Sequence, residues 1–320
     1  LCTFTKLMNS SIFVPLQTNQ RNKKMKSIST DSIQFGEGNF LRGFVDYCIQ
    51  TLNEKTSFHG KVDVIQPLPN GMIEQLKNQT GKYHLFQEGV IAGKNIREKQ
   101  QINCIDQMVN PYKEFDHYLG LAENENLSFV FSNTTEAGIA REPTDIFEAR
   151  PPQSFPGKLT RLLYHRYQKF EGDPSKVLHI IPCELIDKNG SKLREIILEL
   201  CDIWELEQGF KSWILKNYFY NTLVDRILPG FPKKDLEFYN KDLPFDDKLI
   251  VTCEPFFLWV IEGSTDLLKI FPVDQLENIN VRVVPDIGIY RTRKVRTVSY
   301  THLRAHETKA NLVCRLMLEK

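Results

Sequence analysis

One stretch of the sequence decides the fold, and it reads Ile33-Gln34-Phe35-Gly36-Glu37-Gly38-Asn39-Phe40-Leu41-Arg42-Gly43-Phe44. The short apolar run that ends at Phe35 predicts a strand, and the two glycines after it predict a tight turn. Beyond the turn, apolar residues recur at every fourth position, as they do along one face of a helix: Phe40, Phe44, Cys48 and Leu52. The sequence therefore predicts a strand, a glycine turn and a helix in direct succession.

This succession is typical of a turn that binds a dinucleotide. Without Cβ atoms at Gly36 and Gly38, backbone N–H groups can approach a pyrophosphate, and the N-terminus of the helix favours its negative charge. Leu41 stands where the usual fingerprint has a third glycine, so the glycine pair alone is equally compatible with a plain tight turn. We take all ten residues from Ile33 to Arg42 as candidates for contact with a cofactor.

Strands and helices alternate along the rest of the chain. Apolar runs predict three more strands, at 62–65, 127–132 and 177–181. A helical pattern spans 159–170, and helical spacing recurs from 191 to 227 before Pro229-Gly230-Phe231-Pro232 breaks the chain. The alternation predicts an α/β fold, and we place a domain boundary at the break.

Polar residues follow two of the predicted strands. Gln66 comes directly after the second strand, where dinucleotide-binding sheets usually carry an acid that hydrogen-bonds the ribose hydroxyls. The Gln66 amide can still bond a hydroxyl, and no Arg stands beside it to favour a 2′-phosphate, so we expect NAD rather than NADP. Asn133 and Glu136 follow the strand at 127–132, and we assign both to the rim of the cofactor or substrate site.

The composition excludes several classes of function. The 320 residues include 41 Lys plus Arg against 40 Asp plus Glu, so no overall positive charge attracts nucleic acid or anionic lipid. No run reaches the roughly 18 apolar residues that a membrane span needs. We expect a small-molecule partner, and the oligomeric state stays open. The cysteines form no C-x-x-C pair, which indicates reduced thiols in a cytoplasmic protein: Cys2, Cys48, Cys104, Cys183, Cys201, Cys253 and Cys314.

The whole string from Ile33 to Phe44 also closely resembles the nucleotide loop of the mannitol dehydrogenase family, which comprises polyol and uronate dehydrogenases. Three more segments agree in order: Ser132-Asn133-Thr134-Thr135-Glu136-Ala137-Gly138-Ile139, Ile181-Pro182-Cys183-Glu184-Leu185-Ile186 with Asn189-Gly190, and Thr222-Leu223-Val224-Asp225-Arg226-Ile227 with Pro229. The first of these is similar to the branch that interconverts tagaturonate and altronate. The resemblance runs from about residue 31 to residue 296.

The resemblance implies a Rossmann-like NAD-binding domain at 31–230 and, at 231–296, the beginning of a mostly helical substrate domain. A sugar acid would lie between the two. The implied reaction is hydride transfer between NAD and a uronate-derived ketone in hexuronate breakdown, without a metal. Activity on fructuronate or on mannitol stays open, and so does a nucleotide-binding fragment without catalysis.

The resemblance also assigns two catalytic residues. Lys294 matches the family lysine that acts as general acid when the ketone is reduced; by itself it is a solvated charge in a basic run. Asn221 falls where relatives place an amide that donates to the oxygen of the reacting carbon, and a helix-surface amide is the alternative. We interpret Asp225 and Arg226 as structural ion-pairing residues rather than a substrate clamp.

Both ends of the chain differ from the family. We expect residues 1–30 to lie outside the fold as leader sequence ahead of a start at Met8 or Met25, with an organelle transit peptide as the alternative. We interpret residues 297–320 as a non-family tail, because Ser299 replaces an Asn of the family. His302 and His306 have the i, i+4 spacing of a metal pair, but no third ligand is evident, so we expect no metal site.

Overall fold

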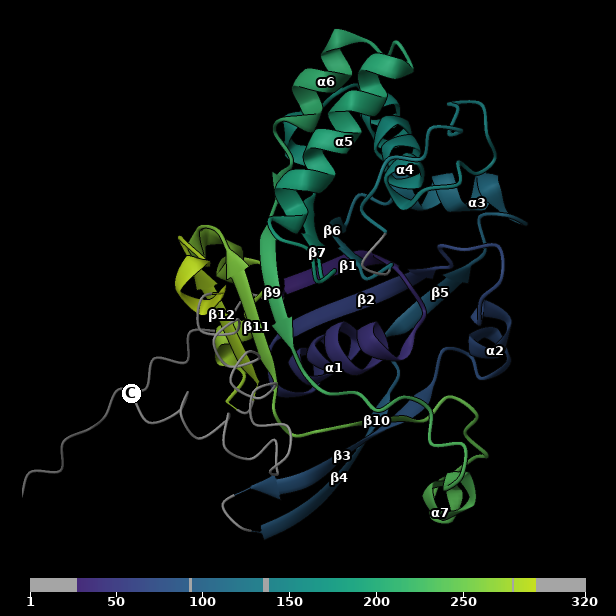
Figure 1. Ribbon diagram of the computed structural model, residues 1–320, viewed down its shortest axis with the longest axis vertical. Coiled ribbons are helices and arrows are strands. Elements are labelled where there is room, and N and C mark those ends of the chain that lie inside the picture. Colours follow the sequence, from purple (N-terminus) through teal and green to yellow (C-terminus); the bar gives the residue numbers. More distant parts are fainter. Residues whose placement is uncertain (1–27, 92–93, 135–137, 278, 292–320) are drawn as a thin grey trace, which may run out of the picture.

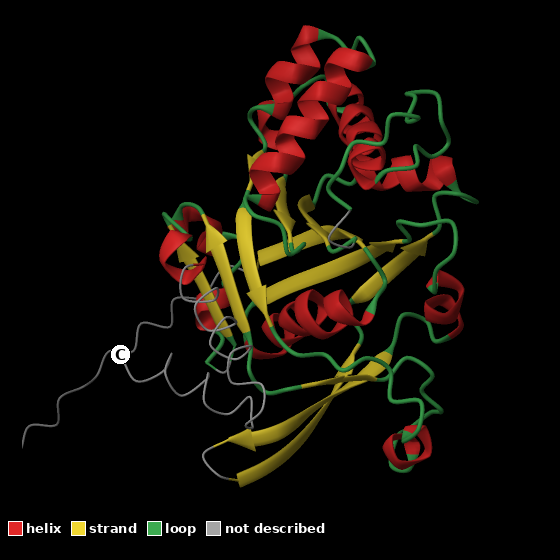
Figure 2. Ribbon diagram, viewed as in Figure 1, coloured by secondary structure: helices red, strands yellow, loops and turns green. Residues whose placement is uncertain are grey.

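The computed structural model describes residues 28–91, 94–134, 138–277 and 279–291. Its centre is a six-stranded parallel sheet (Figures 1 and 2). The order of the strands reverses between β1 and β6, as in a dinucleotide-binding sheet. The predicted α/β, Rossmann-like architecture is thereby confirmed. In spatial order the strands are β5 (Ile105–Val109), β2 (Phe58–Ile65), β1 (Ile28–Phe35), β6 (Leu127–Ser132), β7 (His179–Pro182) and β8 (Tyr218–Phe219).

Helices cover both faces of this sheet (Figure 1). One face packs against α1 (Asn39–Lys55), and Phe129 and Phe131 of β6 point into that core. Ile33 and Phe35 of β1 point into the core on the opposite face, because successive strand residues alternate between faces. The helices over that second face are α3 (Phe115–Gly120), α4 (Phe155–Lys169), α5 (Asn189–Ile203) and α6 (Gln208–Ile214).

The helix after the glycine turn forms as its apolar spacing predicts. Phe44, Cys48 and Leu52 all lie on the side of α1 that is buried against the sheet. Phe44 also stacks on Phe257, with ring centroids 4.2 Å apart. A segment more than two hundred residues further along the chain therefore packs on the helix that begins at the turn.

Two smaller sheets complete the described fold. β10 (Val251–Cys253), β3 (Tyr83–Ile91) and β4 (Lys94–Ile102) form one of them, whose long β3–β4 hairpin projects from the molecule (Figure 1). The other consists of β9 (Asn221–Asp225), β11 (Leu258–Glu262) and β12 (Asn280–Val284), with β9 antiparallel to β11. The remaining α-helices, α2 (Ile73–Asn78) and α7 (Leu236–Asn240), are short.

The structure corrects the sequence reading after residue 217. The helix predicted up to residue 227 is wrong in its last part. Buried Thr222 and Val224 alternate there with less buried neighbours, which is the period of a strand. The described residues beyond 230 add strands, and Val251 and Trp259 are buried in the same core as α1. The break at 229–232 therefore does not separate two packing units. The mostly helical domain is not found among the residues that the structure describes.

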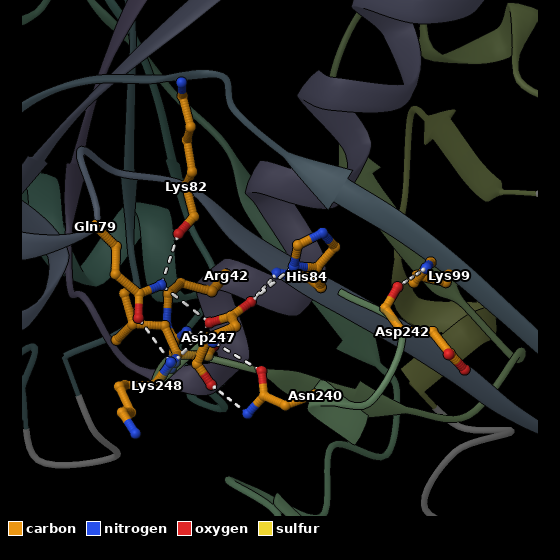
Figure 3. Close-up of polar contacts among 10 residues, drawn as sticks. Arg42, Gln79, Lys82, His84, Lys99, Asn240, Asp242, Asp247 and Lys248 are labelled. Atoms are coloured by element: carbon orange, nitrogen blue, oxygen red, sulfur yellow. Dashed lines mark hydrogen bonds and ion pairs between the residues drawn. The ribbon is translucent and has the colours of Figure 1, made fainter. Parts of the chain in front are cut away.

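A buried carboxylate fastens the loop before β10 to β3 and to the end of α2 (Figure 3). Asp247 accepts hydrogen bonds from the backbone N–H of His84 at 2.6 Å, from Nδ1 of its ring at 2.9 Å, and from Gln79 and Leu249. Burial by itself raises the pKa of Asp247, but these hydrogen bonds outweigh it and hold the pKa below its ordinary value. The Leu249 carbonyl in turn accepts from the Arg42 guanidinium.

We expect Asp247→Asn to lower the free energy of unfolding by about 1 to 3 kcal/mol, because the new amide turns an N–H toward a buried donor and leaves it unpaired. Denaturant titration measures the change. Asp246→Asn is the matched control: that side chain is exposed and pairs with Lys248 at the surface, so a change within about 0.5 kcal/mol is expected. Equal losses in both variants would contradict a fastening role for Asp247.

Candidate cofactor and substrate site

The predicted site residues gather at one edge of the six-stranded sheet. The register pairs Phe35 with Ile65 and with Ser132, so β1, β2 and β6 end side by side. Ser132 is paired in turn with Pro182, the last residue of β7. Open α/β sheets bind ligands at this carboxyl edge, near the point where the strand order reverses. The residues that follow the strand ends there include Gly36, Gln66, Asn133, Glu184 and Asn221.

The glycine turn leaves open space in front of the N-terminus of α1. Gly36 has φ +125°, and a Cβ on it would lie 3.0 Å from the carbonyl oxygen of Asn133, so backbone conformation and space both demand glycine. A Cβ on Gly38 would meet nothing within 4 Å. Gly38 is also the N-cap of the 17-residue α1, whose first N–H groups have no partner within the helix. The N-terminus of α1 therefore faces open space, which is the arrangement that binds phosphate groups at helix N-termini.

Most side chains of the stretch 33–42 hold the turn from inside the protein. Gln34 donates to the Gly36 carbonyl at 3.1 Å, and Arg42 donates through Nε to the Glu37 carbonyl at 3.1 Å. Arg42 is 1% exposed, and burial lowers the pKa of its guanidinium. We therefore place Arg42 behind the turn as a positioning residue. The apolar side chains pack in or against the core: Ile33, Phe35, Phe40 and Leu41.

The side chain of Gln66 is directed to its own loop. It is 3% exposed, and its amide donates to the carbonyls of Leu68 at 2.8 Å and Pro69 at 3.1 Å. These bonds occupy the N–H groups that we expected to serve a ribose hydroxyl. Gln66 consequently shapes the turn after β2, and the carbonyl oxygen of its amide is what it offers to a ligand.

A buried acid shapes the turn after β6. Glu184 is 2% exposed and accepts at 3.0 Å from the hydroxyls of Ser132 and Thr134 and from the Thr134 backbone N–H. Burial raises the pKa of Glu184, and these hydrogen bonds oppose the rise. Asn133, between the two donors, is held by a 2.7 Å bond from its amide to the Cys183 carbonyl. Sequence reasoning missed Glu184, although a polar residue just beyond the end of a buried strand is the same signal that selected Asn133.

Both ends of the Asn221 amide are fixed. Its oxygen accepts from the Ser191 backbone N–H at 3.0 Å, and its nitrogen donates to Glu262 at 2.6 Å. The second oxygen of Glu262 accepts from the Ile287 N–H at 3.2 Å. Asn221 begins strand β9, so the alternative of a helix-surface amide is wrong. Residues 288–291, which follow Ile287, are helical and lead toward Lys294 in the sequence.

Other predicted residues have structural roles or lie outside the described part. Arg226 is 6% exposed and donates to the carbonyls of Gly43 and Glu254 and to the Gln87 amide, so these hydrogen bonds go to neutral groups inside the protein and not to the ion-pair partner that we expected. The residues outside the described part are Glu136, Lys294, His302 and His306.

Neither a metal centre nor a membrane-spanning helix is found among the described residues. Within them, no three His, Cys, Asp or Glu side chains are grouped so that they could hold a metal ion. None of their helices combines the length and hydropathy that crossing a bilayer takes.

Comparison with known proteins gives a consistent result. The family model described as the Mannitol dehydrogenase Rossmann domain matches residues 30–270. The altronate oxidoreductase of Phocaeicola vulgatus is 47% identical over 271 residues, which are 84% of this chain and 56% of that protein. The altronate oxidoreductase of Bacillus subtilis is 46% identical over the same shares. The chain thus spans a little over half the length of these relatives.

Solved structures show the same fold at low identity. Pseudomonas fluorescens mannitol 2-dehydrogenase, in a ternary complex with NAD and D-mannitol, has a TM-score of 0.68 at 18% identity, over 84% of this chain and 55% of that one. A D-sorbitol dehydrogenase has a TM-score of 0.66 at 19% identity, over 86% and 60%. Because the family model matches more than half of the chain, the chain belongs to the mannitol dehydrogenase family.

Proposed function

We propose that the chain carries the cofactor-binding part of a cytoplasmic NAD-dependent oxidoreductase that interconverts D-tagaturonate and D-altronate. The open glycine turn at the carboxyl edge supports the cofactor, because Gly38 leaves the helix N-terminus accessible. Identity of 46–47% with two altronate oxidoreductases supports the substrate. The first of these observations carries the proposal, since every proposed role depends on a cofactor at this edge.

The residues at the carboxyl edge have different proposed roles. The cofactor supplies or accepts the hydride. The backbone of Gly36 and Gly38 holds its pyrophosphate, and Gln34 and Arg42 keep that turn in shape from behind. Asn133 lies where the strand order reverses and is fixed there beside the Glu184 cluster, so it borders the space for the reacting ring.

Ketone reduction also requires a proton and a donor to the carbonyl oxygen. Asn221 is suited to donate, because its amide nitrogen has two hydrogens and Glu262 accepts one of them. Lys294 is the proposed general acid. A lysine has an ordinary pKa of about 10.4, so burial or neighbouring cations must lower it before it can exchange protons near neutral pH. In the reduction, the carbonyl carbon would take the hydride and the carbonyl oxygen would take the proton.

We expect Asn221→Ala to reduce turnover of tagaturonate about a hundredfold, because it removes one donor to the developing oxyanion. Affinity for NADH should stay within about twofold, since Asn221 lies two residues beyond β8 and away from the glycine turn. Steady-state kinetics and NADH titration measure the two effects. Asn126→Ala, on an exposed residue before β6, is the control. Unchanged turnover in Asn221→Ala would remove that residue from the mechanism.

The substrate is tested by following NADH consumption with tagaturonate, fructuronate and fructose in parallel. Tagaturonate should react with the highest kcat/KM. A preference for fructuronate or fructose would move the chain to another activity of the family. In a protein that spans the full length of the matched relatives, NADH binding without turnover of any of the three would leave a nucleotide-binding protein and contradict the proposed reaction.

A further inference from the structure

The end of β2 lacks the charge that usually recognises a ribose. In sheets of this order an Asp or Glu at that place hydrogen-bonds the ribose hydroxyls of NAD and repels the phosphate of NADP. Gln66 stands there, and its amide N–H groups are taken by the carbonyls of Leu68 and Pro69. The position that ordinarily selects the cofactor therefore carries no charge of its own.

A carboxylate from the neighbouring strand reaches the same place. Glu37 belongs to the glycine turn after β1, yet its side-chain oxygen Oε1 accepts from the Met72 backbone N–H in the loop after β2, at 3.2 Å. A Cβ on Gly71 would lie 2.1 Å from this Glu37 oxygen and 2.6 Å from Cδ of Gln66. Glu37, Gln66 and Gly71 thus converge at the end of β2, and glycine at 71 leaves room for the carboxylate.

The Glu37 carboxylate keeps part of its bonding capacity for a ligand. Burial raises the pKa of this carboxyl group, and hydrogen bonds from the backbone N–H groups of Glu37 and Met72 oppose the rise. Two carboxylate oxygens offer about four acceptor sites, and the backbone N–H groups of Met72 and of Glu37 itself use two of them. The nearby Arg42 donates its hydrogen bonds to the carbonyls of Glu37 and Leu249 and to the Asn39 side chain, and its charge lowers the pKa of Glu37 without displacing the effect of burial. Glu37 is 8% exposed, and a charge held so far from water acts strongly on a neighbouring charge.

We propose that Glu37 selects NADH over NADPH: its carboxylate accepts hydrogen bonds from the ribose hydroxyls beside Gln66 and repels a 2′-phosphate there. The inference rests on the proposed function, because it requires a dinucleotide at the carboxyl edge. In most dinucleotide-binding sheets an acid at the end of the second strand recognises the ribose. Here an acid in the turn after the first strand would do so.

The test is calorimetric titration of NADH and NADPH into the protein and its variants. Wild type should bind NADH more tightly. Glu37→Gln should reduce the ratio of the two dissociation constants about tenfold or more, by weakening NADH and strengthening NADPH. Glu37→Asp keeps the charge and should retain the preference for NADH. Circular dichroism and thermal unfolding of each variant show that the titrated protein is folded.

Glu74→Gln is the matched control, because Glu74 follows Gly71 closely, in the first turn of α2, but its side chain is 60% exposed and paired with Lys113. Its ratio should equal that of wild type. A ratio unchanged in Glu37→Gln, or changed equally in Glu74→Gln, overturns the proposal while NADH binding still supports the proposed function. Binding of neither nucleotide to wild type overturns both.

Discussion

Gly38→Val is expected to abolish NADH binding while the fold stays intact. Gly38 has φ −70° and ψ 168°, an extended conformation that valine adopts without strain, and the space beside it is open. The valine side chain would fill the space that a pyrophosphate needs in front of α1. Calorimetric titration with NADH measures the loss, and thermal unfolding should shift by the equivalent of less than about 1 kcal/mol, a typical N-cap effect.

Two glycine variants make this result specific. A Cβ on Gly120, at the end of α3, also meets nothing within 4 Å, so Gly120→Val is the same change away from the site and should bind NADH normally. Gly36→Ala should instead destabilise the protein, since it forces a side chain into φ +125° and against the Asn133 carbonyl. Normal NADH affinity in a folded Gly38→Val protein would show that the turn does not hold the cofactor.

Lys294→Ala is expected to reduce the turnover of tagaturonate about a hundred- to ten-thousandfold, which is the range for a general acid. NADH affinity should not change, because the proposed cofactor contacts lie at the glycine turn. In wild type, kcat/KM for reduction should fall as pH rises through the pKa of the lysine, because the protonated form donates. Lys294→Ala should show no such fall. Steady-state kinetics over pH measure both effects.

Lys192→Ala is the control for this variant. Lys192 is an exposed lysine of α5, so its removal changes the net charge by the same amount without touching the proposed chemistry. Its turnover and pH profile should match wild type. Similar losses in the two variants would mean that Lys294 acts only through overall charge, and would leave the reaction without an assigned proton donor.

Local patterns predicted the centre of the fold well. The strand expected at 127–132 has the same bounds as β6, because a mostly apolar run of this length is typical of a strand and too short for most helices. The strand, glycine turn and helix that begin at Ile33 formed as expected, since each depends on neighbouring residues alone. The parallel sheet then brought Gly36, Gln66 and Asn133 to one edge.

The parts that sequence reasoning missed depend on residues far apart in the chain. β9 was read as helical because its partner is β11, whose paired residues lie more than thirty positions further on. Glu184 bonds Thr134 across 50 residues, and Glu262 bonds Asn221 across 41. No local pattern contains such pairs. The alternation at Thr222 and Val224 indicated a strand, but the helical spacing that precedes these residues obscured this signal.

The central claim, that a nicotinamide dinucleotide binds at the carboxyl edge of the six-stranded sheet, is tested most directly by hydrogen–deuterium exchange with and without NADH. Bound NADH should slow exchange in the glycine turn at 36–42 and in the loops at 66–72 and 132–134, because ligand contacts stabilise these backbone segments. Exchange in the projecting strand at 94–102 should not change. Protection confined to segments other than the three loops, or no protection at saturating NADH, would contradict the account.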